Sequence, residues 1–138
     1  MQNALSRRNF AKRVIGAGGA LAVSGVAKTF AQSAIEKTLD KKLGVALVGL
    51  GYYSTDVLAP ALQETKNVRL AGIVTGTPAK AATWQKKYGI AKKNVYSYET
   101  FDRIADNPNI DIVYVVLPNS MHAEYVIRAA RAGKHVFC

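Results

Sequence analysis

The chain reads Leu43-Gly44-Val45-Ala46-Leu47-Val48-Gly49-Leu50-Gly51-Tyr52-Tyr53-Ser54 at the point that decides its fold. The first six residues are nearly all apolar, and this run with its glycine boundary indicates a strand buried in a parallel sheet. The glycines predict a turn over residues 49–54, and a helix follows over residues 55–63. We expect the apolar side chains of that helix to face inward, namely Val57, Leu58, Ala61 and Leu62. Pro60 predicts a kink or an early-turn position, because an interior proline disrupts a helix.

Strand-like and helix-like segments then alternate to the end of the chain. Thr77 and Pro78 predict a helix start, and Gly89 and Gly133 predict helix ends. The pattern predicts strands over residues 68–74, 95–98, 110–117 and 134–138, and helices over residues 78–88, 99–106 and 120–132. This alternation is typical of βαβ units, which place helices on both faces of a parallel sheet. The sequence therefore predicts an α/β fold with a doubly wound parallel sheet, the Rossmann type.

Residues 49–54 form the motif G-x-G-x-x-S between the first strand and the first helix. Gly49 permits the tight turn, and Gly51 lets a pyrophosphate approach the backbone. Ser54 stands where a third glycine or alanine is usual and is still small enough for close packing of helix and strand. Free N–H groups at the helix start favour phosphate. The motif alone is weak and also fits an ordinary turn, but its place in a βαβ unit favours a dinucleotide.

The segment after the second predicted strand bears on which dinucleotide is bound. NAD-specific folds place an acid there for the ribose 2′-hydroxyl, but residues 75–80 contain none. Thr75 and Thr77 can donate hydroxyl hydrogen bonds. Lys80 lies in the first turn of the next helix, where the helix dipole disfavours a cation unless an anion is bound nearby. We interpret this segment as a 2′-phosphate site and predict NADP; the alternative is a solvated Lys80 and NAD.

Residues 117–122 read Leu117-Pro118-Asn119-Ser120-Met121-His122 and follow the fourth predicted strand. Pro118 and Asn119 end the strand, and Asn119 is suited to cap the next helix. Ligands bind at the carboxyl ends of the strands in open α/β sheets, so this loop is a candidate site. His122 faces either this cleft or solvent, and an ordinary surface or capping histidine fits the pattern equally well.

The net charge of +10 does not indicate nucleic-acid binding. Five basic residues and no acidic residue lie in the first 31 positions, and the remainder holds the other 14 basic and all 9 acidic residues. No basic patch interleaved with aromatic residues is present in that remainder. Cys138 is the single cysteine, so no disulfide can form within the chain, and the sequence shows no metal-ligand cluster.

The N-terminus reads Ser6-Arg7-Arg8-Asn9-Phe10-Ala11-Lys12 ahead of the apolar residues 14–27. This resembles a twin-arginine signal, which exports folded proteins to the periplasm. The apolar run is too short and too rich in glycine and alanine for a good membrane span, although an uncleaved anchor is the alternative. We therefore expect a signal peptide over residues 1–31, a short arm over residues 32–43 and a dinucleotide-binding domain over residues 44–138.

Three further segments resemble the N-terminal half of the Gfo/Idh/MocA oxidoreductases: Val48-Gly49-Leu50-Gly51, Leu117 to Glu124, and Ala132-Gly133-Lys134-His135-Val136. Residues 96–102 and the twin-arginine leader strengthen a likeness to the periplasmic glucose–fructose oxidoreductases within that family. The resemblance implies a nicotinamide cofactor that passes a hydride to or from a sugar or cyclitol carbon. It also implies a homo-oligomer for the full-length protein. By this likeness the cofactor would be lined by Gly49, Leu50, Gly51, Tyr52, Tyr53, Thr75, Gly76, Lys80, Tyr98, Leu117, Pro118, Asn119 and His122.

The resemblance also implies a part that this sequence does not contain. The family follows the Gly133-Lys134-His135 strand with a Glu-Lys-Pro segment, whose lysine assists proton transfer, and with a second α/β domain for substrate. The catalytic lysine is therefore expected just after Cys138, and Lys134 is not that lysine. We expect the chain to be the nucleotide-binding half of an exported NADP-dependent sugar oxidoreductase. The alternative is an exported module that binds a dinucleotide and catalyses nothing.

Overall fold

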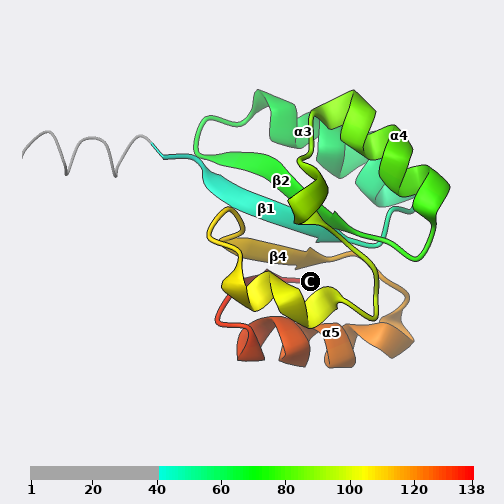
Figure 1. Cartoon of the computed structure of the whole chain (residues 1–138), viewed down its shortest axis with the longest axis vertical. Helices are drawn as coiled ribbons and strands as arrows, with labels where there is room; N and C mark the ends of the chain where they lie inside the picture. Colours follow the sequence, from blue (N-terminus) through cyan, green and yellow to red (C-terminus); the bar gives the residue numbers. More distant parts are fainter. Residues whose placement is uncertain (1–40) are drawn as a thin grey trace, which may run out of the picture. The chain divides into compact units, whose positions relative to one another are not determined.

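A computed structural model describes residues 41–138, and the predicted signal peptide and most of the predicted arm lie outside these residues. Its centre is a parallel sheet of five strands in the order β3-β2-β1-β4-β5 (Figure 1). The strands are β1 (Leu43–Val48), β2 (Val68–Val74), β3 (Val95–Tyr96), β4 (Ile112–Val115) and β5 (His135–Phe137). The continuous apolar run of β1 fits its place between helices on both faces of the sheet, where the side chains of both faces are buried.

Helices cover both faces of this sheet, which confirms the doubly wound α/β fold. The helical segments are η1 (Tyr53–Leu58), α3 (Ala59–Glu64), α4 (Pro78–Tyr88), η2 (Lys92–Asn94), η3 (Phe101–Asp106) and α5 (Asn119–Arg131). Figure 1 shows α3 and α4 on one side of the sheet and α5 on the other. None of the helices in this described part is long and apolar enough to cross a membrane.

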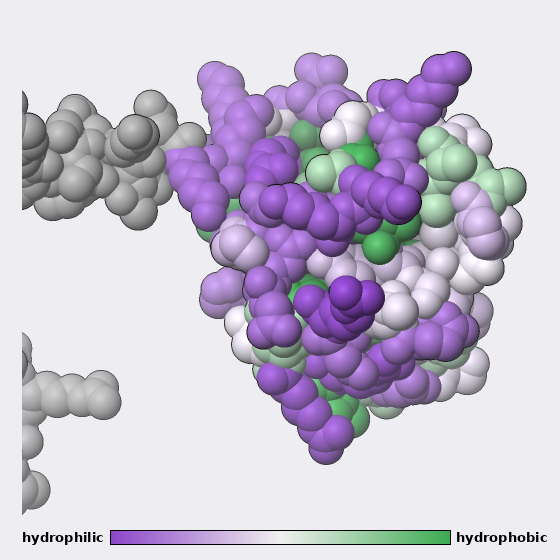
Figure 2. Space-filling view, in the orientation of Figure 1, coloured by the Kyte–Doolittle hydropathy of each residue, from purple (hydrophilic) through white to green (hydrophobic). Residues whose placement is uncertain are grey.

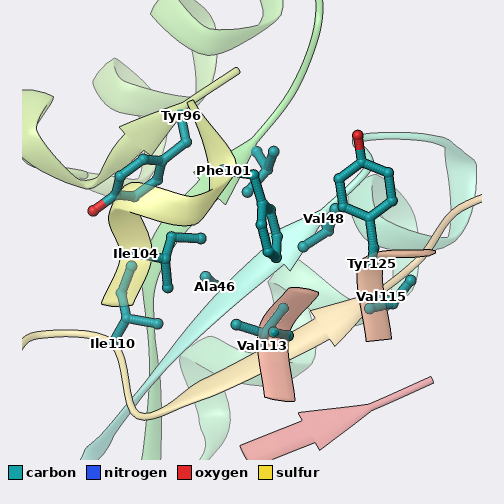
Figure 3. Packing of buried hydrophobic residues seen from close by; sticks show 11 residues of the cluster. Ala46, Val48, Tyr96, Phe101, Ile104, Ile110, Val113, Val115 and Tyr125 are labelled. Atoms are coloured by element: carbon teal, nitrogen blue, oxygen red, sulfur yellow. The ribbon is translucent and has the colours of Figure 1, made fainter. Parts of the chain in front are cut away.

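Two apolar clusters hold the layers together. On one face, η3 and α5 pack Phe101, Ile104 and Tyr125 against β1 and β4 (Figure 3). On the other face, Ala59 and Trp84 from α3 and α4 pack against β1 and β2. Burying one large apolar side chain contributes about 1.5–3 kcal/mol, so these clusters fix which helix lies on which face.

The helix after the glycine loop turns a different set of residues toward the core from the set that the sequence predicted. Its first part, η1, is a π-helical turn in which the Ala59 N–H donates to the Ser54 carbonyl, five residues back. That wider turn puts Ser54 and Ala59 on the same fully buried face, and it turns Val57 outward to 41% exposure. The prediction that Val57 and Ala61 face inward was wrong, whereas Leu58 and Leu62 do pack against the core. Pro60 is the second residue of α3, an early-turn position as expected.

Several element ends also differ from the sequence prediction. β3 and β4 are shorter than predicted, and residues 101–106 form a 3-10 helix. Asn119 is the first residue of α5 rather than its cap: Pro118 holds the cap position, and no side chain caps the helix. The predicted stops at Gly89 and Gly133 are correct, because both glycines adopt the left-handed conformation, with φ of 65° and 69°.

Candidate cofactor site

The loops that follow β1, β2 and β4 meet at the carboxyl edge of the sheet. The Gly49 N–H donates to the Val74 carbonyl at 3.0 Å, and the Val116 N–H donates to the Val48 carbonyl at 2.8 Å. These bonds extend the sheet pairing past the strand ends, so the three loops start at the same level. Most of the candidate residues lie on these three loops or at the start of the helices that follow them, and the fold brings the loops together. Tyr98 is the exception, since it follows β3.

Gly49 is required by both conformation and space. Its φ is +92°, which side-chain-bearing residues rarely adopt, and a Cβ there would lie 2.3 Å from the Val116 carbonyl oxygen. The same Cβ would lie 2.9 Å from the Leu117 side chain. The tight turn therefore lets the loop after β1 close onto the loop after β4.

At Gly51, neither the backbone conformation nor the available space requires a glycine, because a Cβ there would meet no heavy atom within 4 Å. The residue is exposed, and its carbonyl accepts hydrogen bonds from the Thr55 N–H and hydroxyl at 3.0 and 2.9 Å. Ser54 is fully buried, and its hydroxyl donates to the Gly49 carbonyl at 2.6 Å. These hydrogen bonds join the glycine loop to the start of η1, and the outer face of Gly51 stays open. This open face beside a helix start fits a pyrophosphate group.

Lys80 reaches the glycine loop from the first turn of α4. Its ammonium donates to the Leu50 carbonyl at 3.2 Å. The lysine also lines a pocket of about 460 Å³ between the glycine loop and α4, with Leu50, Gly51, Tyr52, Thr55, Asp56, Ala79, Thr83 and Trp84. A cation therefore stands where the loops after β1 and β2 meet. Asp56 places one carboxylate in the same pocket, a feature that sequence reasoning missed.

The loop after β2 is closed on one side by an aromatic ring. Thr75 is buried, and its hydroxyl oxygen accepts the Thr77 N–H at 3.2 Å. A Cβ on Gly76 would lie 3.2 Å from the Tyr98 ring, so the ring packs on this glycine. Burial raises the pKa of the Tyr98 phenol. The structure thus brings Tyr98 beside Gly76, although the two are far apart in sequence.

Tyr98 is held by Arg128, which sequence reasoning also missed. The Arg128 guanidinium donates to the Tyr98 carbonyl at 3.1 Å and to both carboxylate oxygens of Asp102 at 3.0 Å. It also stacks on the rings of Phe101 and Tyr125, each 4.9 Å away. Its Glu124 partner is one helical turn away, at 3.1 Å. No local pattern indicated the contacts with Asp102 and Tyr98, which lie 26 and 30 residues earlier in the chain.

The loop after β4 is fixed by its histidine. His122 Nε2 lies 2.6 Å from the Leu117 carbonyl oxygen, and the ring is half-buried. Leu117 is half-buried against Gly49, while Pro118 and Asn119 are exposed at the helix start. One His122 nitrogen is therefore engaged within its own loop.

Tyr52 and Tyr53 are also exposed, at 76% and 47%, on the neighbouring loop after β1.

Lys134 lies at the other end of the sheet. It precedes β5, and its ammonium donates to the Asn107 carbonyl at 3.0 Å, in the loop before β4. Both positions are at the amino ends of parallel strands, away from the cofactor loops. Lys134 therefore lies apart from the residues of the candidate cofactor site.

Comparisons with known proteins agree with this geometry. Residues 43–138 match the Gfo/Idh/MocA family model, described as "Oxidoreductase family, NAD-binding Rossmann fold". The chain is 56% identical to an aldose-aldose oxidoreductase from Caulobacter crescentus, with a TM-score of 0.68 over 70% of this chain and 29% of that one. It is 28% identical to a 3-ketoreductase from Actinomadura kijaniata, in complex with TDP-benzene and NADP, with a TM-score of 0.61 over 70% and 29%.

A curated relative gives the same result. The inositol 2-dehydrogenase/D-chiro-inositol 3-dehydrogenase of Lactiplantibacillus plantarum is 29% identical over 94 residues, which are 68% of this chain and 26% of that protein. The chain thus spans between a quarter and a third of the length of these three relatives. Fold, glycine loop and family match coincide over the same residues, and the chain therefore belongs to the Gfo/Idh/MocA oxidoreductases, of which residues 43–138 form the NAD-binding Rossmann fold.

Proposed function

We propose that this chain is the NADP-binding half of an oxidoreductase that moves a hydride to or from a sugar or polyol, in the manner of a glucose–fructose oxidoreductase. The observation that carries the proposal is the pairing of an open Gly51 with Lys80 at the adjoining loop. The relatives named as acting on aldoses and inositols support the substrate class.

Each part of the site has a separate task in this proposal. The residues of the glycine loop would hold the pyrophosphate against the start of η1, where backbone N–H groups and the helix dipole favour an anion. Lys80 would pair with the 2′-phosphate, exchanging its bond to the neutral Leu50 carbonyl for one to an anionic oxygen. The nicotinamide supplies the hydride when bound, and the residues described here bind and orient the cofactor.

The test is a titration of the chain with NADP and NAD, followed by the fluorescence of Trp84. Trp84 is the single tryptophan and lines the Lys80 pocket, so it reports on this site. Lys80→Ala is compared with Lys86→Ala, which removes the same charge from an exposed position near the other end of α4. We expect tighter binding of NADP than of NAD, and we expect Lys80→Ala alone to weaken NADP binding by about tenfold.

The other outcomes are equally informative. Equal weakening of NADP and NAD by Lys80→Ala would mean that the lysine shapes the loop rather than selecting a 2′-phosphate. Binding of neither cofactor by a folded chain would overturn the dinucleotide assignment. Binding without hydride transfer to any sugar by the protein joined to its second domain would favour the non-catalytic module.

We also infer that residues 1–31 direct export to the periplasm through the twin-arginine pathway. The paired Arg7 and Arg8 ahead of the short apolar run support this. The test is fractionation of cells that carry Arg7→Lys with Arg8→Lys, beside a control with Arg13→Lys and Lys28→Arg. Loss of the periplasmic form in the first variant alone is the expected result, and unchanged export would overturn the inference.

A further inference from the structure

A second pocket lies at the end of the sheet opposite the cofactor loops. Its volume is about 450 Å³, and we call it the β3 pocket. It is lined by Lys92, Lys93, Val95, Tyr96, Thr100, Arg103, Asp106, Asn107 and Pro108. Lys92 and Lys93 directly precede β3, and Asn107 and Pro108 lie shortly before β4, so the pocket lies toward the amino ends of these parallel strands. The candidate cofactor loops follow the strands instead, which makes this a separate site.

The lining of the β3 pocket is basic. Lys92, Lys93 and Arg103 face a single lining carboxylate, that of Asp106. Within residues 41–138 none of the three cations takes part in an ion pair. Figure 2 shows hydrophilic residues gathered over the face that carries η2 and η3 in Figure 1. Because a hollow concentrates the field of its lining charges, the pocket attracts anions.

A buried hydrogen-bond chain beneath the pocket has a fixed direction. The Asn109 N–H can only donate, and it donates to the Asn107 side-chain oxygen at 2.9 Å. The Asn107 amide nitrogen must then donate, and it does so to the Asn94 side-chain oxygen at 2.8 Å and to the Tyr96 hydroxyl at 2.7 Å. At the other end, the Asn94 amide nitrogen donates to the Ala71 carbonyl at 2.8 Å. Backbone groups at both ends thus fix the orientation of both amides.

This direction leaves one donor unused. Tyr96 accepts the Asn107 hydrogen bond, and its own hydroxyl hydrogen finds no acceptor among the described residues. Tyr96 is 7% exposed and lines the β3 pocket, and Figure 3 shows its hydroxyl pointing away from Phe101 and the buried cluster. The hydroxyl hydrogen is therefore available to a ligand in the pocket that can accept a hydrogen bond.

We propose that the β3 pocket binds a small oxyanion, a phosphate, sulfate or carboxylate group of a soluble molecule. The Tyr96 hydroxyl donates to an anion oxygen, and Lys93 and Arg103 neutralise its charge. The bound anion accepts the unused hydroxyl hydrogen and offsets the charges of Lys93 and Arg103. The proposal does not depend on the cofactor site, because the two sites share no residue.

The test is an NMR titration of the full chain with inorganic phosphate, sulfate and acetate in separate arms, each matched in ionic strength with sodium chloride. The arms show which oxyanion the pocket prefers, and the amide shifts show where each binds. Lys93→Gln with Arg103→Gln removes two pocket cations. Lys86→Gln with Arg131→Gln removes the same charges from exposed positions outside the pocket. Tyr96→Phe removes the hydroxyl donor.

We expect saturable shifts at residues 92–96 and 103–107, with binding about three- to tenfold weaker in the pocket double variant and unchanged in the control. Tyr96→Phe should also weaken binding; if it fails to fold, the double variant decides alone. Shifts confined to residues 49–55 would overturn the proposal, because the anion would then occupy only the cofactor loop. Equal weakening by both double variants would overturn it as well, since that indicates general charge screening.

Discussion

The Lys80 ammonium lies 3.2 Å from the Leu50 carbonyl oxygen and joins the first turn of α4 to the glycine loop, across 30 residues of sequence. A lysine in the first turn of a helix faces the positive end of the helix dipole, which is unfavourable without a nearby acceptor. The carbonyl supplies that acceptor. The contact also holds the cation at the junction of the loops after β1 and β2, where it is available to a phosphate.

Asp56→Asn should tighten NADP binding. Asp56 and Lys80 line the same pocket, so removing the carboxylate removes a repulsion from the 2′-phosphate that Lys80 would bind. Because the pocket is open to solvent, the gain is modest, up to about fivefold in Kd. Titration with NADP and NAD measures it, and an equal change for both cofactors would contradict this account.

Gly49→Ala and Gly51→Ala should separate stability from binding. Gly49→Ala forces a Cβ against the Val116 carbonyl at a positive φ, and we expect a loss of about 2–4 kcal/mol in unfolding free energy. Gly51→Ala has free space and no positive φ, so its stability should stay within about 1 kcal/mol. Its methyl group would nevertheless obstruct a pyrophosphate.

Urea unfolding and NADP titration of the two glycine variants provide the check. A stable Gly51→Ala chain that binds NADP as well as the original sequence does would rule out a close approach of phosphate to this residue.

Asn107→Ala should destabilise the fold by about 2–3 kcal/mol. The substitution leaves the buried Asn94 side-chain oxygen and the Asn109 N–H without their partners. Asn109→Ala is the matched control, because within the described chain Asn109 contributes to this network only through its backbone. Comparable losses in the two variants, measured by chemical denaturation, would show that the side-chain network adds little.

Asp102→Asn should cost stability at neutral pH and much less in acid. Hydrogen bonds from the Arg128 guanidinium lower the pKa of Asp102 below its ordinary 3.8. The pKa of Asp102 is thus lower in the folded chain than in the unfolded chain. The stabilisation by the ion pair is therefore fully present at pH values well above about 3.8, and it is lost as the pH falls through the pKa of the folded chain. The difference in unfolding free energy between the two chains should therefore be nearly the same at about pH 7 and 5 and smaller at about pH 3. A difference that is the same at all three values would show that the ion pair is not its source.

Much of the fold follows from short-range patterns. The apolar run 43–48 predicted a buried strand of a parallel sheet, and five of its six residues are buried in the structure. The glycine stops at Gly89 and Gly133 and the helix start at Pro78 were also correct. Errors arose where tertiary packing overrides the local pattern, as in the π-turn that buries Ser54 and turns Val57 outward.

The sequence by itself determined the α/β order, the buried first strand and the loop that carries Gly49 and Gly51, because these depend on the periodicity and the residue types of neighbouring positions. Only the tertiary structure decided which distant side chains meet: Lys80 with the Leu50 carbonyl, Tyr98 with Gly76, and Asn107 with Tyr96. Such contacts depend on strand register and helix phase, which are set by packing of the whole sheet. No local pattern encodes them, and for this reason the anion pocket beside β3 emerged from the fold alone.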